Sequence, residues 1–202
     1  MTAEPDARAA ATRSDVRQIS DSRVLAALTH PLRRRLLDVL KVGGAATVGL
    51  LAERTGQAVG NVSHHLKVLA GADLIEEAPE LARDRRERWW RLTPGTLRWA
   101  RADFQGDPVA EAVADAAGSL QLERQAGLVR AWTATRPDYD PAWHEGCAVA
   151  TEAWLRLTPE EAREFAADLV AVLERWADRP VPEDGRERES VFAFAHSVPA
   201  RP

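Results

Sequence analysis

The sequence predicts a mainly helical fold that includes one β-hairpin, and three observations lead to that prediction. Apolar residues recur at helical spacing through most of residues 22–70 and again from about residue 108. Two short apolar and aromatic runs flank a polar stretch at 79–87, as expected of paired strands. A proline-containing break at 136–141 then separates a C-terminal region in which both helix and strand are expected.

The first helices are expected at 22–28 and from Pro31 onward. Proline is favoured at the first position of a helix, because its missing N–H would have no intrahelical partner there. The second helix is expected to end at the glycine pair 43–44. Its apolar face consists of Leu32, Leu36, Val39 and Leu40.

Two further helices are expected on either side of a tight turn. Thr47 is a suitable N-cap for the first of them, and the turn at 55–57 leads into the second, at 58–70. Because a helix advances about 100° per residue, the residues of 58–70 divide into two faces. The face expected to pack against the preceding helices contains Val59, Val62, Leu66 and Leu69.

The strands of the hairpin are expected at 74–77 and 88–92. Two short helices around a turn, followed by a hairpin with a basic tip, form the arrangement of a winged helix-turn-helix. Thr93 and Pro94 predict the start of another helix, and a long helix is expected at 108–132. The predicted fold is therefore mainly α with a β-hairpin wing, followed by a long dimerisation helix and a small C-terminal α/β region.

Motifs in this segment resemble one family of regulators. The runs TVGLLAERTG (47–56) and VSHHLKVL (62–69), preceded by ALTHPLRRRLLDVL (27–40), resemble the arsenical-repressor-type, or ArsR-like, winged-helix regulators over residues 22–92. The resemblance implies a dimeric DNA-binding regulator, commonly a repressor released by a signal. It also implies that the segment 63–65 lies on the DNA-facing helix.

The sequence departs from this family at two places. Asp73 stands where the family usually has a glycine before the wing, and aspartate tolerates the left-handed backbone conformation better than most residues do. The cysteine pair of the family's metal sensors is missing from 47–56. Neither a metal nor a cofactor is therefore expected.

The residues expected to contact DNA lie on or next to the helix 58–70 and in the wing 76–90. Amides, hydroxyls and imidazoles can donate and accept hydrogen bonds at base edges, lysine and arginine suit phosphates, and a glycine permits close approach. A basic wing tip can lie along the backbone or enter the minor groove. The predicted set is Gln57, Gly60, Asn61, Ser63, His64, His65, Lys67, Arg83, Arg85, Arg86 and Arg88.

The charge of the chain is distributed unevenly. The net charge is −4, but residues 22–105 contain 14 Lys and Arg against 9 Asp and Glu, whereas residues 106–202 contain 10 against 18. A basic segment joined to an acidic one favours double-stranded DNA as the partner of the basic segment. Composition alone leaves random scatter of charge open as the simpler explanation.

Four regions are expected along the chain. Residues 1–21 are expected to be a flexible arm, 22–105 the DNA-binding domain, 106–135 a helical dimerisation segment, and 136–202 an α/β region that is a candidate effector or partner site. In this last region, strands are expected at 147–157 and 191–198, on either side of a helix capped by Thr158 and Pro159. The seven tryptophans of the chain are better explained by core packing and a dimer seam than by an aromatic-lined effector pocket.

Several other classes of protein are not expected. No apolar run is long enough to cross a bilayer, and a single cysteine, Cys147, suits a cytoplasmic protein. Asp140, His144 and Cys147 have suitable chemistry for a metal site but lack a further ligand. No nucleophile-elbow, phosphate-loop or dinucleotide motif is present, so an enzyme is not expected.

These observations predict a cytoplasmic, sequence-specific DNA-binding regulator. A dimeric repressor that reads an inverted repeat through helix 58–70 and wing 76–90 is the preferred function. The alternative is a winged-helix protein-interaction module that docks another regulator through its acidic C-terminal region, since fold alone does not settle function.

Overall fold

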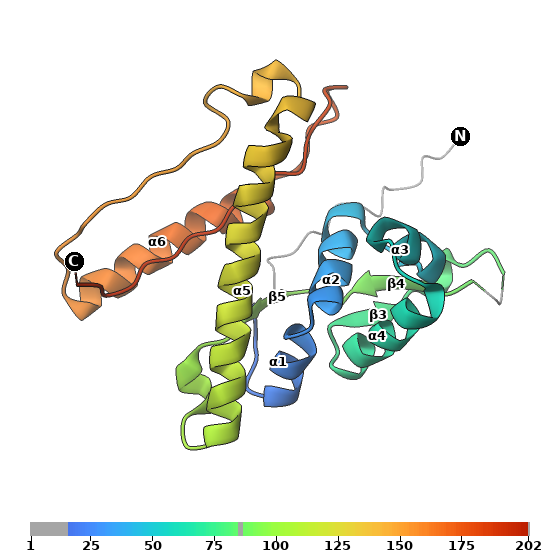
Figure 1. Cartoon of the computed structure of the whole chain (residues 1–202), viewed down its shortest axis with the longest axis horizontal. Helices are drawn as coiled ribbons and strands as arrows, with labels where there is room; N and C mark the ends of the chain where they lie inside the picture. Colours follow the sequence, from blue (N-terminus) through green and yellow to red (C-terminus); the bar gives the residue numbers. More distant parts are fainter. Residues whose placement is uncertain (1–15, 85–86, 202) are drawn as a thin grey trace, which may run out of the picture. The chain divides into compact units, whose positions relative to one another are not determined.

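A computed structural model describes residues 16–84 and 87–201 of the chain (Figure 1). The described chain forms two units. The first, called the N-terminal unit, runs to Leu122, and the second, called the C-terminal unit, begins at Glu123. Within the described residues, no helix combines the length and the apolar character that crossing a membrane requires.

Four helices form most of the N-terminal unit, and their ends follow the expected capping signals. Helices α1 and α2 span Ser22–Leu28 and Pro31–Gly43, and α2 has its proline in the first turn. Helices α3 and α4 span Val48–Thr55 and Val59–Gly71. The Thr47 hydroxyl accepts a hydrogen bond from the Leu50 amide at 3.2 Å, which caps α3. Gly56, with φ of 66°, ends α3 in the left-handed conformation that favours glycine.

The core of this unit consists of side chains from all four helices. The largest fully buried side chains are Leu25, Leu36, Leu51, Val62, Leu66 and Leu69. The expected buried face of α4 is thus confirmed at three positions, but it was wrong at Val59, which is 55% exposed. Val59 is the first residue of α4. The apolar stripe of α4 therefore begins one turn before the part of the helix that is buried in the core.

A three-stranded antiparallel sheet completes the helical core. Strands β2, β3 and β4 span Ala46–Thr47, Ile75–Glu77 and Trp89–Leu92, in the order β2-β4-β3. Trp90 lies opposite Ala46 in the sheet register and is buried. The hairpin β3–β4 confirms the predicted wing strands, and a short 3₁₀ helix, η1 (Pro79–Leu81), lies in the connection between them. The two-residue strand β2 is too short to leave a period in the sequence.

A second small sheet corrects two expectations. Strand β1 (Val16–Gln18) pairs in parallel with β5 (Thr96–Arg98), so the expected flexible arm ends before residue 16 and no helix begins at 93–94. Ile19 anchors β1, because its side chain is only 2% exposed and its amide donates to the Arg98 carbonyl at 2.8 Å. Gly95, with φ of 114°, turns the chain away from helical geometry before β5. The rest of the arm, residues 1–15, lies outside the described residues.

The predicted long helix is present as α5 (Pro108–Thr135), the longest helix in Figure 1. A short 3₁₀ helix, η2 (Arg101–Phe104), precedes it. Ala110, Ala114 and Ala117 of α5 are buried in the core of the N-terminal unit. Their spacing of four and three residues places them on one face of the helix.

The C-terminal unit is simpler than expected. It contains the end of α5, two 3₁₀ helices (Arg136–Asp138 and Pro141–Trp143) and α6 (Pro159–Ala177). The capping box that predicted α6 is present, since Thr158 and Glu161 exchange side-chain to backbone hydrogen bonds.

The strands expected at 147–157 and 191–198 were wrong, because the described residues of both segments are irregular. An apolar run forms a strand only where another strand supplies backbone hydrogen bonds, and the sequence of the run does not reveal that partner. Core packing was also wrong for two of the tail tryptophans, since Trp154 and Trp176 are 70% and 61% exposed, whereas their place in a dimer seam stays a prediction.

Candidate nucleic-acid interface

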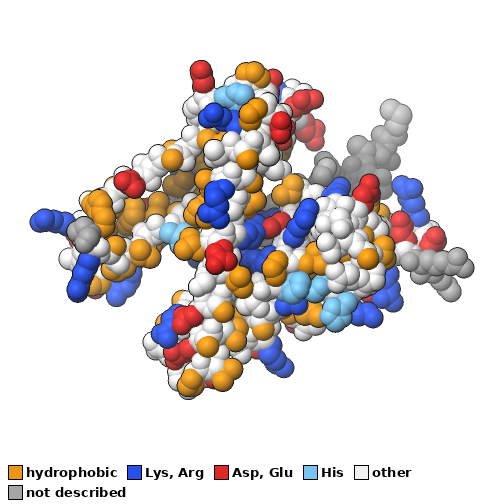
Figure 2. Space-filling model, in the orientation of Figure 1, with side chains coloured by type: hydrophobic (Ala, Val, Ile, Leu, Met, Phe, Trp, Pro, Cys, Tyr) orange, Lys and Arg blue, Asp and Glu red, His pale blue; other side chains and the backbone are white. Residues whose placement is uncertain are grey.

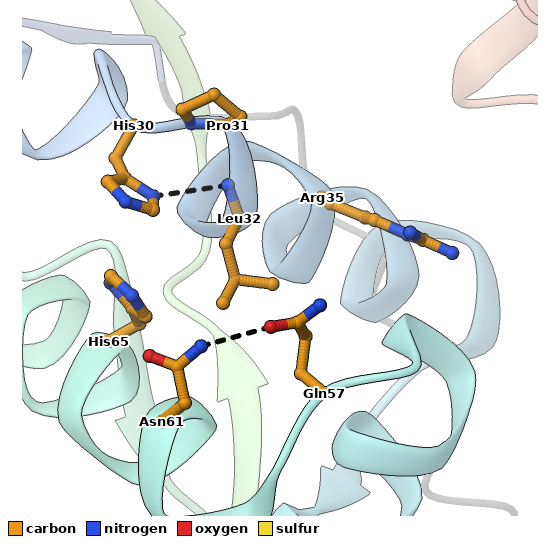
Figure 3. Close-up of a pocket in the computed structure, with 7 residues that line it drawn as sticks. All are labelled: His30, Pro31, Leu32, Arg35, Gln57, Asn61 and His65. Carbon is orange, nitrogen blue, oxygen red and sulfur yellow. Dashed lines mark hydrogen bonds between the residues drawn. The ribbon is translucent and has the colours of Figure 1, made fainter.

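Helix α4 presents a polar face to solvent. Gln57, Gly60, Asn61, His64 and Lys67 are all exposed, as the sequence predicts. The Asn61 amide donates to the Gln57 side-chain carbonyl at 3.0 Å, which holds the two amide groups side by side (Figure 3). A Cβ atom at Gly60 would meet nothing within 4 Å, so the backbone of α4 is open to close approach there.

His65 lies on the other side of the helix, and its expected contact with DNA was wrong. Its side chain is 7% exposed, and its ring lies against that of His30 with 4.3 Å between centroids. Position 65 follows Val62 by three residues and precedes Leu69 by four, so helical spacing places it in the buried stripe. Its neighbour His64 remains exposed and meets His65 edge-on at 5.3 Å. Figure 2 shows histidine side chains gathered on the surface of this unit.

The pair formed by the buried His65 and the half-buried His30 favours its neutral form. Burial lowers the pKa of His65 below the usual 6.5, and the nearby His30 and Arg33 lower it further. Burial, followed by the charges of Arg33 and His64, also lowers the pKa of His30. The Nδ1 atom of His30 accepts a hydrogen bond from the Leu32 amide at 3.1 Å and so caps α2.

A hollow between the beginning of α2 and α4 adjoins this pair (Figure 3). Gln57 and Asn61 line it from the side of α4, and Arg35 lines it from α2. The Arg35 guanidinium donates to the Arg54 carbonyl at 3.3 Å, which ties α2 to the end of α3.

The wing lies beside α4 and has both basic and acidic side chains. Arg88 is 63% exposed and lies 3.6 Å from Glu77. The Arg83 amide donates to the Glu87 carboxylate at 2.9 Å, and this hydrogen bond holds the pKa of Glu87 below its usual value. Arg85 and Arg86, the remaining predicted contacts of the wing, lie outside the described residues.

A second hollow separates α4 from the wing. Thr47 and Val48 at the beginning of α3, Val59 and Ser63 on α4, and Glu87 and Arg88 of the wing line this hollow. Sequence reasoning missed Thr47 and Val59 as members of this surface. The signal that could have found them is their position at the first turn of a helix, where side chains extend beyond the core.

Comparison with known proteins identifies the domain. A family described as "Helix-turn-helix domain" matches residues 28–78. A segment of 54 residues is 41% identical to the transcriptional repressor SdpR of Bacillus subtilis, and it covers 27% of this chain and 59% of that protein. The N-terminal unit therefore contains a helix-turn-helix domain, and the match spans less than two thirds of the length of SdpR.

Two solved structures are also similar to the chain. One is the homodimeric winged helix-turn-helix DNA-binding domain of a possible ArsR-family regulator from Mycobacterium bovis, 24% identical, covering 52% of this chain and 83% of that one with a TM-score of 0.32. The other is a cysteine-to-serine mutant of MarR from E. coli complexed with operator DNA, 15% identical, covering 76% of this chain and 85% of that one with a TM-score of 0.32.

The backbone at Asp73, where the resemblance noted above predicts a glycine, keeps the left-handed conformation. Asp73 has φ of 53°, as the sequence predicts for a residue in place of glycine. Its carbonyl accepts a hydrogen bond from the Arg17 guanidinium at 2.6 Å. This contact joins β1 to the turn between α4 and the wing.

The three residues considered for a metal site in the C-terminal unit have local roles instead. The Asp140 carboxylate caps the 3₁₀ helix that begins at Pro141, His144 Nε2 lies 2.8 Å from the Arg136 carbonyl, and the Cys147 thiol donates to the Ala142 carbonyl at 3.3 Å. Across the described residues, no three His, Cys, Asp or Glu side chains are grouped as metal ligands would be.

Proposed function

We propose that the protein is a sequence-specific DNA-binding transcriptional regulator that acts as a homodimeric repressor. The observation that carries this proposal is the exposed face of α4, where the amides of Gln57 and Asn61, the His64 imidazole and the Lys67 ammonium lie beside a wing whose arginines Arg83 and Arg88 are exposed. The 41% identity of one segment to a repressor supports the same conclusion.

In this proposal α4 enters the major groove and reads base edges. Gln57, Asn61 and His64 can donate and accept hydrogen bonds there, and a bidentate contact of an amide with adenine discriminates by about 1–3 kcal/mol. The exposed Gly60 lets the helix backbone approach the bases closely. Lys67, Arg83 and Arg88 would contact phosphates, as would Arg85 and Arg86 beyond the described residues.

A homodimer would place two copies of α4 in successive major grooves. Helix α5 supports this arrangement, because it leaves large apolar side chains exposed, namely Val109, Leu120, Leu122, Leu128 and Val129. The apolar residues of α1 are buried within the protomer, so α5 rather than α1 is the better candidate for the seam. A symmetric dimer reads an inverted repeat with half-sites about 10 bp apart.

A second candidate function is the docking of another regulator by the C-terminal unit. The observation that favours it is α6, which has no buried residue although its apolar residues recur at helical spacing. A small-molecule effector that releases the repressor from DNA would bind the same exposed surface of α6. Docking and DNA binding are compatible, because they use different parts of the chain.

Selection of random duplexes by the full-length protein at roughly physiological salt tests the proposal. We expect enrichment of a palindromic motif with half-sites one helical turn apart. Weak, salt-sensitive binding without any enriched motif would contradict sequence-specific reading. A single enriched half-site without symmetry would contradict the homodimer and leave base reading intact.

A further inference from the structure

The hollow between α4 and the wing contains an exposed apolar side chain that the fold does not use. Val59 belongs by helical spacing to the buried stripe of α4, yet it is 55% exposed. Val48, half-buried at the first position of α3, lines the same hollow. Two valines from different helices therefore border one solvent-facing hollow at the beginning of the helix proposed to read bases.

A hydroxyl group with unused hydrogen-bonding capacity lies next to this apolar surface. Ser63 follows Val59 by four residues, so the two side chains are neighbours on the helix surface. Helical serines commonly donate to the carbonyl four residues earlier. In the described part of the chain, no hydrogen bond is made by the Ser63 hydroxyl, so its proton remains available to an incoming acceptor.

The rim of the hollow suits a DNA backbone. The exposed Arg88 supplies a positive charge on the side of the wing. Thr47, which lies opposite Trp89 in the sheet register, also lines the hollow; its hydroxyl accepts from the Leu50 amide and keeps its own proton for donation. Cations and hydroxyls of this kind contact phosphates, which would orient a base edge toward the valines.

Thymine is the base whose major-groove edge matches this surface. It alone presents a methyl group, together with the O4 acceptor, whereas cytosine presents an amino donor. The Glu87 carboxylate also borders the hollow, and its Oε2 atom accepts from the Arg83 amide at 2.9 Å. Because a carboxylate has further acceptor sites, enrichment of cytosine at this position of the selected duplex would show that Glu87 rather than the valines selects the base. We propose that Val59 and Val48 contact the methyl group of a thymine in each half-site, with Ser63 donating to its O4 atom; this inference rests on the proposed function.

Replacement of thymines by deoxyuridine tests the methyl contact, because deoxyuridine differs from thymidine only in lacking that methyl group. In the duplex obtained by selection, each thymine is replaced singly and the affinity of the full-length protein is measured by fluorescence anisotropy. We expect one position per half-site at which the loss of the methyl group weakens binding about fourfold, the effect of removing one carbon from an apolar contact.

Four variants separate this contact from other effects of deoxyuridine on the duplex. Val59→Ala should bring the affinities for the thymine and deoxyuridine duplexes closer together than in the wild type, and the double variant Val48→Ala, Val59→Ala should bind the two duplexes equally. Ser63→Ala should weaken binding to both duplexes by the same factor and so preserve their ratio. Val42→Ala changes a valine that is 68% exposed on α2 and does not line the hollow, so it should behave as the wild type does.

Two results of the affinity measurements would overturn the inference. One is equal affinity of the wild type for thymine and deoxyuridine at every position, and the other is a Val59→Ala variant that keeps the wild-type ratio. Both presuppose a wild-type protein that binds its selected duplex specifically. Absence of specific binding would instead contradict the proposed function.

Discussion

The two units of the protein use their apolar residues in opposite ways. In the N-terminal unit, Leu36, Val62 and Leu66 are fully buried among four helices and a small sheet. In the C-terminal unit, α6 has no buried residue, and Trp154 and Trp176 remain largely exposed. An apolar stripe at helical spacing therefore predicts a helix in both units but does not reveal what covers the stripe.

This difference separates two sources of helix stability. Helices of the N-terminal unit are stabilised by tertiary packing, as most protein helices are. Helix α6 depends on its caps and its intrinsic propensity within the protomer. The comparison predicts that matched substitutions in the two units will have different consequences for folding.

The largest difference is expected for truncation of an apolar side chain. Leu66→Ala removes a fully buried side chain and should lower the free energy of unfolding by about 2–5 kcal/mol, because it leaves a cavity. Trp176→Ala, in the exposed stripe of α6, should change it by less than about 0.5 kcal/mol. Urea unfolding followed by far-ultraviolet circular dichroism measures both. Comparable losses for the two variants would show that α6 is packed in solution.

A smaller difference is expected for loss of a helix cap. Thr158→Ala removes the hydroxyl that accepts from the Glu161 amide at 3.2 Å and should cost α6 about 1 kcal/mol. Hydrogen exchange at the first turn of α6 should therefore become faster, without any change in global unfolding. Thr47→Ala is the matched control, because the same cap in the N-terminal unit should lower global stability by a similar amount. An equal loss of global stability in both variants would remove the distinction between the units.

Acid should weaken the N-terminal unit through the contacting histidines His30 and His65. Because burial lowers the pKa of His65 and His30 below 6.5, the unfolded chain binds protons more readily than the folded chain does. The free energy of unfolding is therefore undiminished by these histidines above pH 6.5, and it decreases as the pH falls below that value. Urea unfolding between about pH 7.5 and 5 measures the decline, and His65→Gln should reduce it. A pH dependence unchanged by that substitution would assign the effect to other groups.

The sequence was sufficient for the parts of the fold that local patterns specify. The caps at Thr47 and Thr158, Pro31 in the first turn of α2, and the left-handed Asp73 are local features, and the structure has all four. The sequence was insufficient where a remote segment decides the outcome. Strand β1 forms because β5 lies beside it, and 147–157 stays irregular because no strand does within the described chain.

The candidate interface shows the same division. Helical geometry alone predicts that Asn61, His64 and Lys67 share an exposed face, and they do. His65 was expected to be exposed and is buried, whereas Val59 was expected to be buried and is exposed. Both differences depend on where the helices that cover α4 end. His65 lies within reach of His30, whereas Val59 precedes the covered part of α4.

A repeat of the duplex selection with His64→Ala and Arg88→Ala tests whether α4 reads bases while the wing contacts phosphates. Both side chains are exposed, so the variants should fold. His64→Ala should relax the choice of one base by about 1–3 kcal/mol and keep the salt dependence. Arg88→Ala should keep the motif, weaken all duplexes alike and reduce the salt slope by about 1. An altered motif with Arg88→Ala and an unaltered one with His64→Ala would contradict base reading by α4 and assign it to the wing.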